Sequence, residues 1–268
     1  MRQFDVFVFD ENFDEAQGNL PQPPFTDPEL GWFYTNDWNK HLEEIEGEWV
    51  IFTHPSIKID RDFLNNVAEI TDGFPMVDAF APRIRTLPSS KATESVITNK
   101  RKFLSGFLLK RWTKGSGFIE IDENAPMCYV AIPHPFIAIY ARRIIQRTGG
   151  FDTTLPPASR LADFTLRMMH AGGKMFSVPY LVTQATTNEA ERIVGITAKN
   201  AQATTPYLKS TALVLSKAFG IEASLPFALQ HPSVIPTLLR NRSALKEKRK
   251  AATLLSKLKA DFLKEVTL

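Results

Sequence analysis

Two glycine pairs divide the middle of the chain into short segments, and this pattern constrains the fold more than any other feature. Glycine accepts the left-handed backbone found at helix ends, so Gly149-Gly150 and Gly172-Gly173 each mark a helix C-terminus. We therefore predict one helix at residues 144–148 and another at 163–171, where apolar side chains recur at helical spacing. A short apolar strand follows at residues 174–179. Helices that alternate with strands indicate an α/β fold.

This stretch resembles the second half of the family 2 glycosyltransferases, which have the GT-A fold. In that family a helix leads into a Gly-Gly-Phe-Asp turn. A loop follows, and an acidic motif opens a second helix that ends near Arg and Gly-Gly, before a strand closing on Val-Pro. Here the same order is carried by Gly149-Gly150-Phe151-Asp152, the loop at 156–161, the helix at 163–171 and Val178-Pro179. The resemblance implies a GT-A-like central mixed sheet flanked by helices, and transfer of a sugar from a nucleotide-sugar donor.

A buried strand is predicted at residues 4–9, and it ends in Asp10 and Glu11. It resembles the second strand of the family, whose trailing acidic residues contact the base and ribose of the donor. The resemblance thus implies that Asp10 and Glu11 bind the donor; a strand followed by a solvated turn is the alternative. The family has a further strand and helix before this one. Here that first strand is missing, or residues 4–9 are the first strand and the second has decayed into the loop at 18–29.

A helix is predicted at residues 38–46 and a strand at 49–52. The run that starts at Asn39 resembles the approach of the family to its metal site. That site is an Asp-x-Asp motif, whose carboxylates hold a divalent cation on the donor diphosphate. In this chain His54 and Ser56 occupy the two positions.

The metal prediction has two open alternatives. Many relatives have a further His ligand, and Gln184 is nearest to that place. Mn²⁺ and Mg²⁺ prefer oxygen ligands, so Ser56 is a poor substitute for a carboxylate, although His54 is able to ligate a transition metal. The resemblance implies either a divalent metal (Mn²⁺ or Mg²⁺) held by His54, Ser56 and Gln184, or a protein that uses no metal. An ordinary turn after a strand is the alternative for His54 and Ser56.

The predicted base also departs from the family pattern. An inverting transferase needs a base that deprotonates the acceptor hydroxyl. In the family an acidic pair after the Gly-Gly-Phe-Asp loop supplies it, but those positions hold Arg160 and Leu161. A later acidic residue, Asp163, remains, so the base is displaced to Asp163 or lost. A structural role for Asp163 at the start of a helix is the alternative. Arg160 is a fixed cation that would replace the charge of the metal on the diphosphate.

Two more residues are predicted to bind the donor. Asp78 lies in a predicted strand at 76–82 and is expected to face the cleft, and Arg167 lies on the polar side of the second helix. We expect Asp10, His54, Ser56 and Asp163 to converge on one cleft at the carboxyl ends of the strands, because open α/β sheets bind ligands there.

Other predicted elements are a helix at 61–71 capped by Asp60, strands at 118–121 and 127–132, and helical pieces at 210–219 and 226–239. The basic run at residues 87–117 is interpreted as a phosphate-binding loop or a solvated face.

The last segment, residues 240–268, is predicted to be an amphipathic helix with a basic face. Its apolar stripe must be buried, because an isolated helix is marginal in water. We expect it to pack on its own domain or on a second subunit, as in a homo-oligomer. Peripheral membrane binding through the basic face is the alternative. The sequence thus predicts a GT-A-like domain at 1–184 and a helical extension at 185–268.

Composition limits the other classes of function. A net charge of +3 in 268 residues does not demand a polyanionic partner, and no basic motif interleaved with aromatic residues indicates nucleic-acid binding. Cys128 is the single cysteine, so no disulfide can form within the chain, which favours a reducing compartment. We find no secretory signal and no run of ~20 apolar residues. The sequence predicts a cytoplasmic protein, or one peripheral on the inner face of the membrane.

Two functions stay open at this stage. The first is transfer of a sugar to a glycan or lipid-linked acceptor in polysaccharide or glycoconjugate biosynthesis. The second is a non-catalytic GT-A module that binds a sugar nucleotide, a glycan or a partner transferase. Both are open because the metal positions and the base positions depart from the family pattern.

Overall fold

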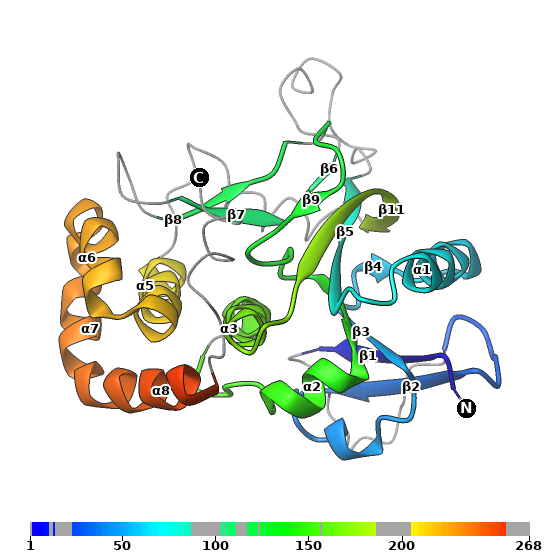
Figure 1. Cartoon of the computed structure of the whole chain (residues 1–268), viewed down its shortest axis with the longest axis horizontal. Coiled ribbons are helices and arrows are strands. Elements are labelled where there is room, and N and C mark those ends of the chain that lie inside the picture. The colour runs from blue at the N-terminus through cyan, green and yellow to red at the C-terminus, as the bar shows by residue number, and fades with distance from the viewer. Residues whose placement is uncertain are drawn as a thin grey trace.

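The computed structural model of the chain describes residues 2–10, 13, 23–86, 103–104, 106–110, 117–122, 124–155, 157–185 and 205–255. Figure 1 shows a central sheet with helices on both sides. The strands are β1 (Phe4–Phe9), β2 (Leu30–Thr35), β3 (Trp49–Thr53), β4 (Ile57–Lys58), β5 (Ala79–Thr86), β6 (Phe103–Leu104), β7 (Phe107–Lys110), β8 (Gly117–Glu120), β9 (Cys128–Tyr129), β10 (Ile137–Ala141) and β11 (Met175–Ala185). The helices are α1 (Arg61–Gly73), α2 (Arg142–Thr148), α3 (Pro157–His170), α5 (Thr205–Phe219), α6 (Ile221–Gln230), α7 (Ile235–Arg240) and α8 (Arg242–Leu255), with short 3₁₀ turns η2 (Leu42–Glu44) and η4 (Pro232–Val234).

The central sheet has the strand order β2-β1-β3-β10-β5-β11-β4, and β6 and β9 add to it by pairing with β5 and β11. β2 and β3 run parallel to β1, β10 runs antiparallel to both β3 and β5, and β11 runs parallel to β5. The carboxyl ends of β1, β3, β5 and β11 therefore lie at the same edge of the sheet. β7 and β8 form a separate hairpin, which contains the strand predicted at 118–121. The predicted α/β architecture with a central mixed sheet is confirmed.

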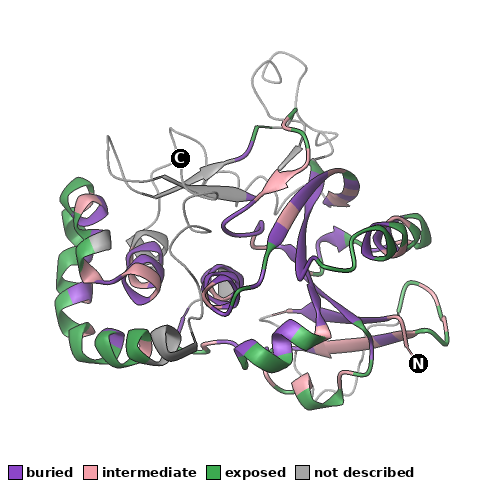
Figure 2. Cartoon of the chain, viewed as in Figure 1, coloured by how far each residue is buried: buried purple, intermediate pink, exposed green. Residues whose placement is uncertain are grey.

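Both faces of the sheet are covered by helices, which explains the nearly continuous apolar runs in its strands. Along β1, Phe7 and Phe9 join the core that contains α3 and the C-terminal helices, while Val6 and Val8 join the core that contains α1. Figure 2 shows the buried strands between helices whose outer faces are exposed. Successive side chains of β1 point to opposite faces of the sheet. Because each face is covered by a core, β1 has no exposed residue.

The predicted helix ends are confirmed at both glycine pairs and at Asp60. α2 and α3 stop where Gly149 and Gly172 adopt positive φ values of 80° and 89°. At the start of α1, the Asp60 side chain accepts a hydrogen bond from the Phe63 backbone N–H at 2.9 Å. These features depend on local chemistry, so the sequence reveals them.

Residues 30–35 form a strand that the sequence analysis missed. β2 pairs in parallel with β1 along its whole length, with Leu30 opposite Phe4. The second strand has therefore not decayed: it follows β1 in the chain and lies outside β1 in the sheet. Gly31 is required in β2, because a Cβ there would collide with the carboxylate of Asp5. That buried carboxylate accepts the backbone N–H groups of Glu46 and Gly47, at 2.8 and 2.7 Å.

Residues 38–46, all of which the structure describes, do not form the predicted helix. Their helical part is the 3₁₀ turn η2. The buried ring of Trp38 packs on Phe52 and Phe151, and Asn39 hydrogen-bonds to the backbone of Phe151. These long-range contacts decide the path of the backbone over its local helix preference.

Three other predicted boundaries are corrected. β5 begins at Ala79, which leaves the preceding Met76 87% exposed. The strand predicted at 127–132 is reduced to the two residues of β9, which pair with β11. α3 begins at Pro157, so Asp163 lies inside the helix and does not open it. The predicted placement of Asp163 at the positive end of a helix dipole is therefore wrong.

The C-terminal helices pack on the rest of the chain. α5 contacts α3, α6 and α8, and α8 also contacts α3. Leu245 of α8 is buried in the same core cluster as Leu166 of α3. Three parts of the sequence predictions lie outside the described residues: positions 256–268 of the tail helix, Glu11, and most of the basic run at 87–117. Among the helices that the structure describes, none has the length and apolar character needed to cross a membrane.

Candidate functional site

The carboxyl ends of β1 and β3 bring two predicted site residues to one edge of the sheet. Val8 of β1 lies opposite Thr53 of β3, so Asp10 and His54 each follow the end of neighbouring parallel strands. The Asp10 backbone N–H donates to the carbonyl oxygen of Thr35 at 3.1 Å, which holds this end of β1 against β2. The ends of parallel strands are the usual ligand-binding edge of an open α/β sheet.

His54 and Ser56 form a compact turn at this edge. The Ser56 backbone N–H donates to His54 Nδ1 at 3.1 Å, and the Ser56 hydroxyl lies 2.7 Å from the same nitrogen. Because Nδ1 accepts this backbone hydrogen, the neutral ring carries its proton on Nε2. The His54 ring also packs on Phe136, with ring centroids 4.9 Å apart. His54 is thus oriented as a hydrogen-bond donor.

A second histidine, His134, lies behind Phe136, and its ring centroid is 5.2 Å from that of Phe136. Burial lowers the pKa of His134 to about 3, so the ring is neutral at physiological pH. The sequence analysis assigned His134 no role. The structure makes it part of the support for Phe136, and hence for the His54 ring.

Arg160 reaches the same edge from α3. Its Cζ lies 5.9 Å from the ring centroid of Phe9, the last residue of β1. Nε donates to the carbonyl oxygen of Leu155 at 2.8 Å, and Nη2 donates to that of Thr153 at 3.2 Å. These two bonds fix the guanidinium beside the end of β1. We refer to Asp10, His54, Ser56 and Arg160 as the strand-end site.

Gln184 joins this edge through pairing of β11 with β4. It lies opposite Lys58, two residues after Ser56. The carboxyl end of β11 and the His54–Ser56 turn are therefore neighbours in the sheet. The position predicted for a further ligand is near the turn, as the family pattern implies, but it carries an amide.

The residues that the structure describes at this edge do not fit a site for Mn²⁺ or Mg²⁺. Among the described residues, no three His, Cys, Asp or Glu side chains are grouped closely enough to hold a metal ion. A metal-binding histidine normally donates from one ring nitrogen to a second-shell acceptor and ligates through the other. His54 instead accepts at Nδ1 and carries its proton on Nε2. Ser56 offers a hydroxyl, where hard cations favour carboxylates.

The structure does not bring Asp78 to the strand-end site. Asp78 comes directly before β5, and its carbonyl oxygen accepts the Ala141 N–H at 2.9 Å. Ala141 is the last residue of β10 and lies opposite Trp49, the first residue of β3. Asp78 therefore lies at the opposite edge of the sheet from His54. Its carboxylate contacts Arg143 at 3.3 Å and accepts the Lys174 N–H at 3.2 Å.

Asp163 and Arg167 belong to a buried ion-pair cluster between α3 and α5. Asp163 Oδ2 lies 2.9 Å from Arg167 Nε, and Asp163 Oδ1 lies 2.7 Å from Lys217 Nζ. Arg167 also donates to the carbonyl oxygens of Thr148 and Gly150. Both oxygens of Asp163 are thus occupied, and its carboxylate faces α5. This is the environment of a structural residue, and the role of Asp163 as a base stays a prediction.

Lys217 also connects this cluster to the Gly-Gly-Phe-Asp turn. Its Nζ lies 2.8 Å from Asp152 Oδ2, and Lys248 of α8 contacts the same oxygen at 2.7 Å. Burial raises the pKa of Asp152, but hydrogen bonds from Lys217, Lys248 and Thr154 outweigh burial and hold that pKa well below its usual range. Lys217 and Lys248, which sequence analysis did not single out, attach α5 and α8 to the turn.

Asn39 was noted in the sequence only as the start of the matched run, and the structure shows what it does. Its Oδ1 accepts the Phe151 N–H at 2.7 Å, and its Nδ2 donates to the Phe151 carbonyl oxygen at 3.0 Å. Gly150 is needed beside it, because a Cβ there would lie 2.5 Å from Asn39 Oδ1. Asn39 therefore hydrogen-bonds to both backbone groups of Phe151, as a paired backbone segment would, and this holds the turn in place.

Replacing Asn39 with alanine is expected to lower the free energy of unfolding by about 2–3 kcal/mol, because both backbone groups of Phe151 lose their partner. Urea unfolding followed by tryptophan fluorescence measures this. Asn65→Ala, at an exposed position of α1, is the matched control and should change the midpoint little. Equal midpoints for the two variants would contradict a structural role of Asn39.

The chain was compared with known proteins at the level of sequence and of structure. No protein-family model and no curated protein sequence matches it. Among solved structures, it is similar to GalNAc-T7 with UDP, GalNAc and Mn²⁺, with a TM-score of 0.54 and 10% identity over 94% of this chain and 54% of that one. The chain thus spans about half the length of GalNAc-T7.

Two other similar structures have lower TM-scores. One is the mannosyltransferase PcManGT from Pyrobaculum calidifontis in complex with GDP-Man and Mn²⁺, with a TM-score of 0.43 and 15% identity over 99% of this chain and 86% of that one. The other is S. aureus TarS 1-349 in complex with UDP-GlcNAc, with a TM-score of 0.42 and 14% identity over 93% of this chain and 83% of that one.

At 10% identity the likeness to GalNAc-T7 concerns the fold. The Gly-Gly-Phe-Asp turn and the helix after it lie on one face of the sheet, with the strand-end site beside them. The chain has a GT-A-like glycosyltransferase fold.

Proposed function

We propose that the chain binds a nucleotide-sugar donor at the strand-end site and transfers its sugar to a hydroxyl of an acceptor. The observation that carries this proposal is the position of Arg160. Its guanidinium is fixed beside the last residue of β1, at the edge where His54 follows the neighbouring parallel strand. A cation and a ring N–H donor on one ligand-binding edge suit a diphosphate.

The parts of the donor would be held by different residues. Arg160 is the cation for the diphosphate, since a guanidinium matches phosphate oxygens geometrically. Nε2–H of His54 donates to a phosphate oxygen, a bond that the Ser56 N–H favours by occupying Nδ1. Asp10, at the end of β1, accepts from hydroxyl or base N–H groups of the nucleoside. In this proposal these groups stabilise the leaving diphosphate. Among the described residues, no cluster of His, Cys, Asp or Glu fits a divalent metal.

The identity of the acceptor rests on the resemblance to family 2 glycosyltransferases. That resemblance favours a glycan or a lipid-linked glycan in polysaccharide or glycoconjugate biosynthesis, made at the cytoplasmic side of a membrane. We propose this acceptor class as the one to test first.

A non-catalytic donor-binding module is the second candidate, and two observations favour it. Arg160 and the buried Leu161 occupy the positions of the acidic pair, so neither supplies a base. Asp163 is the acidic residue that remains, and both of its oxygens are ion-paired. A protein of this kind would bind a sugar nucleotide without turnover.

Donor binding tests the proposed site. We expect Arg160→Met to weaken binding of the donor by about 10- to 100-fold, the worth of a charge-assisted hydrogen bond. His54→Ala should weaken it by roughly tenfold or less, because one neutral donor is lost. Calorimetric titration with a panel that includes UDP-GlcNAc and GDP-mannose, with Mn²⁺ and with a chelator, measures both effects. Added Mn²⁺ should leave the affinity unchanged.

The control is Arg147→Met, which removes one exposed cation from α2 without touching the strand-end site. Unchanged affinity in Arg160→Met would contradict the assigned site, and binding that requires Mn²⁺ would contradict the metal-independent reading. The catalytic and non-catalytic candidates are then separated with the donor that binds: release of nucleoside diphosphate in the presence of acceptor glycans indicates a transferase. Tight binding with no release indicates a binding module.

A further inference from the structure

Four large apolar side chains are exposed together on α6 and α7, at the outer end of the C-terminal helices. Leu225 and Leu229 of α6 are 51% and 77% exposed, and Ile235 and Leu239 of α7 are 39% and 66% exposed. Single exposed leucines are ordinary on protein surfaces, but a contiguous group of this kind marks a contact surface. We call these four residues the apolar patch.

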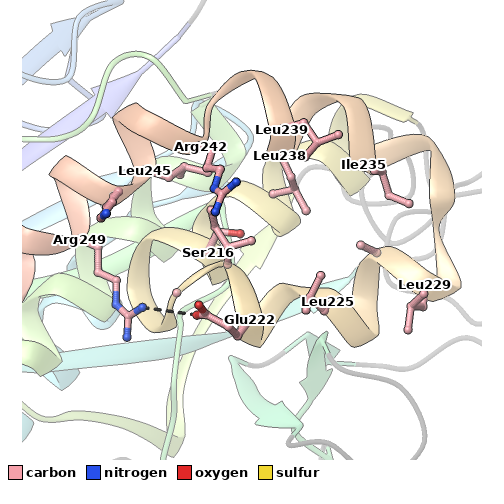
Figure 3. A pocket seen from close by; sticks show the side chains of 14 residues that line it. Ser216, Glu222, Leu225, Leu229, Ile235, Leu238, Leu239, Arg242, Leu245 and Arg249 are labelled. Carbon is pink, nitrogen blue, oxygen red and sulfur yellow. Dashed lines mark ion pairs between the residues drawn. The ribbon is translucent and has the colours of Figure 1, made fainter.

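The patch surrounds a groove of about 540 Å³ between α6, α7 and α8. Figure 3 shows Leu225, Leu229, Ile235 and Leu239 arranged around it, with Leu238 and Leu245 on the inner side. Leu238 and Leu245 are buried in the core, so they anchor α7 and α8. Figure 2 shows that the outer surfaces of these helices are exposed.

A basic ridge borders the groove on α8. Arg242, Lys246 and Arg249 line it, and all three are exposed. Their spacing of four and three residues places them on one side of the helix. Arg249 lies 3.7 Å from Glu222 of α6 in an exposed ion pair.

The surrounding segment has the same sign of charge. Residues 221–255 contain the acidic residues Glu222 and Glu247 and the basic residues Arg240, Arg242, Lys246, Lys248, Arg249 and Lys250. Lys248 is partly buried and forms an ion pair with Asp152. The excess of positive charge at the groove therefore comes from exposed side chains.

We propose that the apolar patch and the basic ridge together bind the surface of a membrane that contains anionic lipid. The leucines enter the boundary between headgroups and acyl chains, and Arg242 and Lys246 contact lipid phosphates. The charge decides between occupants. A second copy of this chain seated on the same surface by a two-fold axis would bring the basic ridge toward itself, whereas an anionic bilayer complements it.

This inference differs from insertion of the last helix itself. Leu245, on the apolar side of α8, is buried in the core of the protein and so cannot contact a membrane. Within the described part of the C-terminal helices, the large exposed apolar side chains come from α6 and α7, and α8 contributes the charges. The inference goes beyond the proposed sugar transfer and does not depend on it.

Co-sedimentation of the full chain with vesicles tests the proposal. The protein should sediment with vesicles of phosphatidylcholine and phosphatidylglycerol, less at high salt, and weakly with phosphatidylcholine alone. Arg242→Gln combined with Lys246→Gln should weaken binding about 25-fold, at roughly fivefold per cation. Leu229→Gln combined with Leu239→Gln should weaken it by at least about tenfold, because the buried apolar area is lost.

Matched controls carry the same changes elsewhere on the surface. Arg61→Gln with Arg147→Gln removes two exposed cations from α1 and α2, and Met76→Gln with Tyr180→Gln removes two exposed apolar side chains. Both controls should bind vesicles as the unchanged protein does. Thermal unfolding of each variant establishes that it is folded, independently of the vesicle result.

Three results would overturn the inference. The first is failure of the full chain to sediment with phosphatidylglycerol vesicles. The second is equal sedimentation of Leu229→Gln with Leu239→Gln and of its control, Met76→Gln with Tyr180→Gln. The third is a dimer of the full chain in light scattering that becomes a monomer in Leu229→Gln with Leu239→Gln, without vesicle binding by either; the patch would then be an interface between copies.

Discussion

Replacing Lys217 with methionine is expected to lower the free energy of unfolding by about 3–5 kcal/mol, the usual cost of removing one partner from a buried ion pair. Lys217 is buried between two carboxylates, with Asp152 at 2.8 Å and Asp163 at 2.7 Å. Methionine keeps an unbranched apolar stem and lacks the ammonium group, so the loss reports on the charge. Urea unfolding at neutral pH, with the slope of the transition checked for two-state behaviour, measures it.

Lys246→Met is the matched control, because Lys246 is exposed on α8. It should leave the unfolding midpoint nearly unchanged. Lys217→Met should also loosen the attachment of α5 and α8 to the Gly-Gly-Phe-Asp turn, seen as faster proteolysis within the C-terminal helices. A loss below about 1 kcal/mol, which is the range of exposed pairs, would mean that Asp152 and Asp163 are adequately held by Lys248 and Arg167.

The second large effect is expected from Asp163→Asn, and it separates the two roles assigned to this residue. A structural role predicts a loss of about 3–5 kcal/mol in unfolding free energy, because Arg167 and Lys217 lose a buried carboxylate. The folded fraction should then keep its affinity for the donor. A role as general base predicts the reverse: little change in stability and a fall in turnover of about 10²- to 10⁴-fold.

Asp72→Asn, at an exposed position near the end of α1, is the control for the chemical change itself. The measurements are urea unfolding, donor titration and, where transfer is detected, kcat at saturating donor. We expect the structural outcome, since both oxygens of Asp163 are engaged by cations. Normal stability of Asp163→Asn with abolished transfer would establish Asp163 as the base.

The features that the sequence determined are those set by local chemistry. The glycine pairs at 149–150 and 172–173 end helices because glycine alone adopts positive φ without cost. Asp60 caps α1 because its side chain reaches the backbone N–H of Phe63 three residues later. The strand β1 follows from a continuous apolar run, which suits a strand covered on both faces. The helix ends at the glycine pairs and the Asp60 cap do not depend on the rest of the chain.

Tertiary contacts decided the elements that the sequence analysis missed. β2 contains a glycine and most of its residues are half-buried, and it is a strand because it pairs with β1. Its Gly31 leaves room for the carboxylate of Asp5. Residues 38–46 have a helical sequence pattern, but they do not form an α-helix because Trp38 and Asn39 contact Phe151. Propensity is worth tenths of a kcal/mol per residue, roughly, and such buried contacts outweigh it.

The candidate site shows the same division. The sequence placed Asp10 and His54 after two buried strands, and parallel pairing of those strands then brought them to one edge. The positions of the other predicted charged residues depend on strand direction and on helix packing. Because β10 runs antiparallel to both β3 and β5, Asp78 lies at the opposite edge of the sheet from His54. α5 supplies Lys217, whose Nζ forms an ion pair with the carboxylate of Asp163. Those partners are distant in the chain, so only the packing of the sheet and helices reveals them.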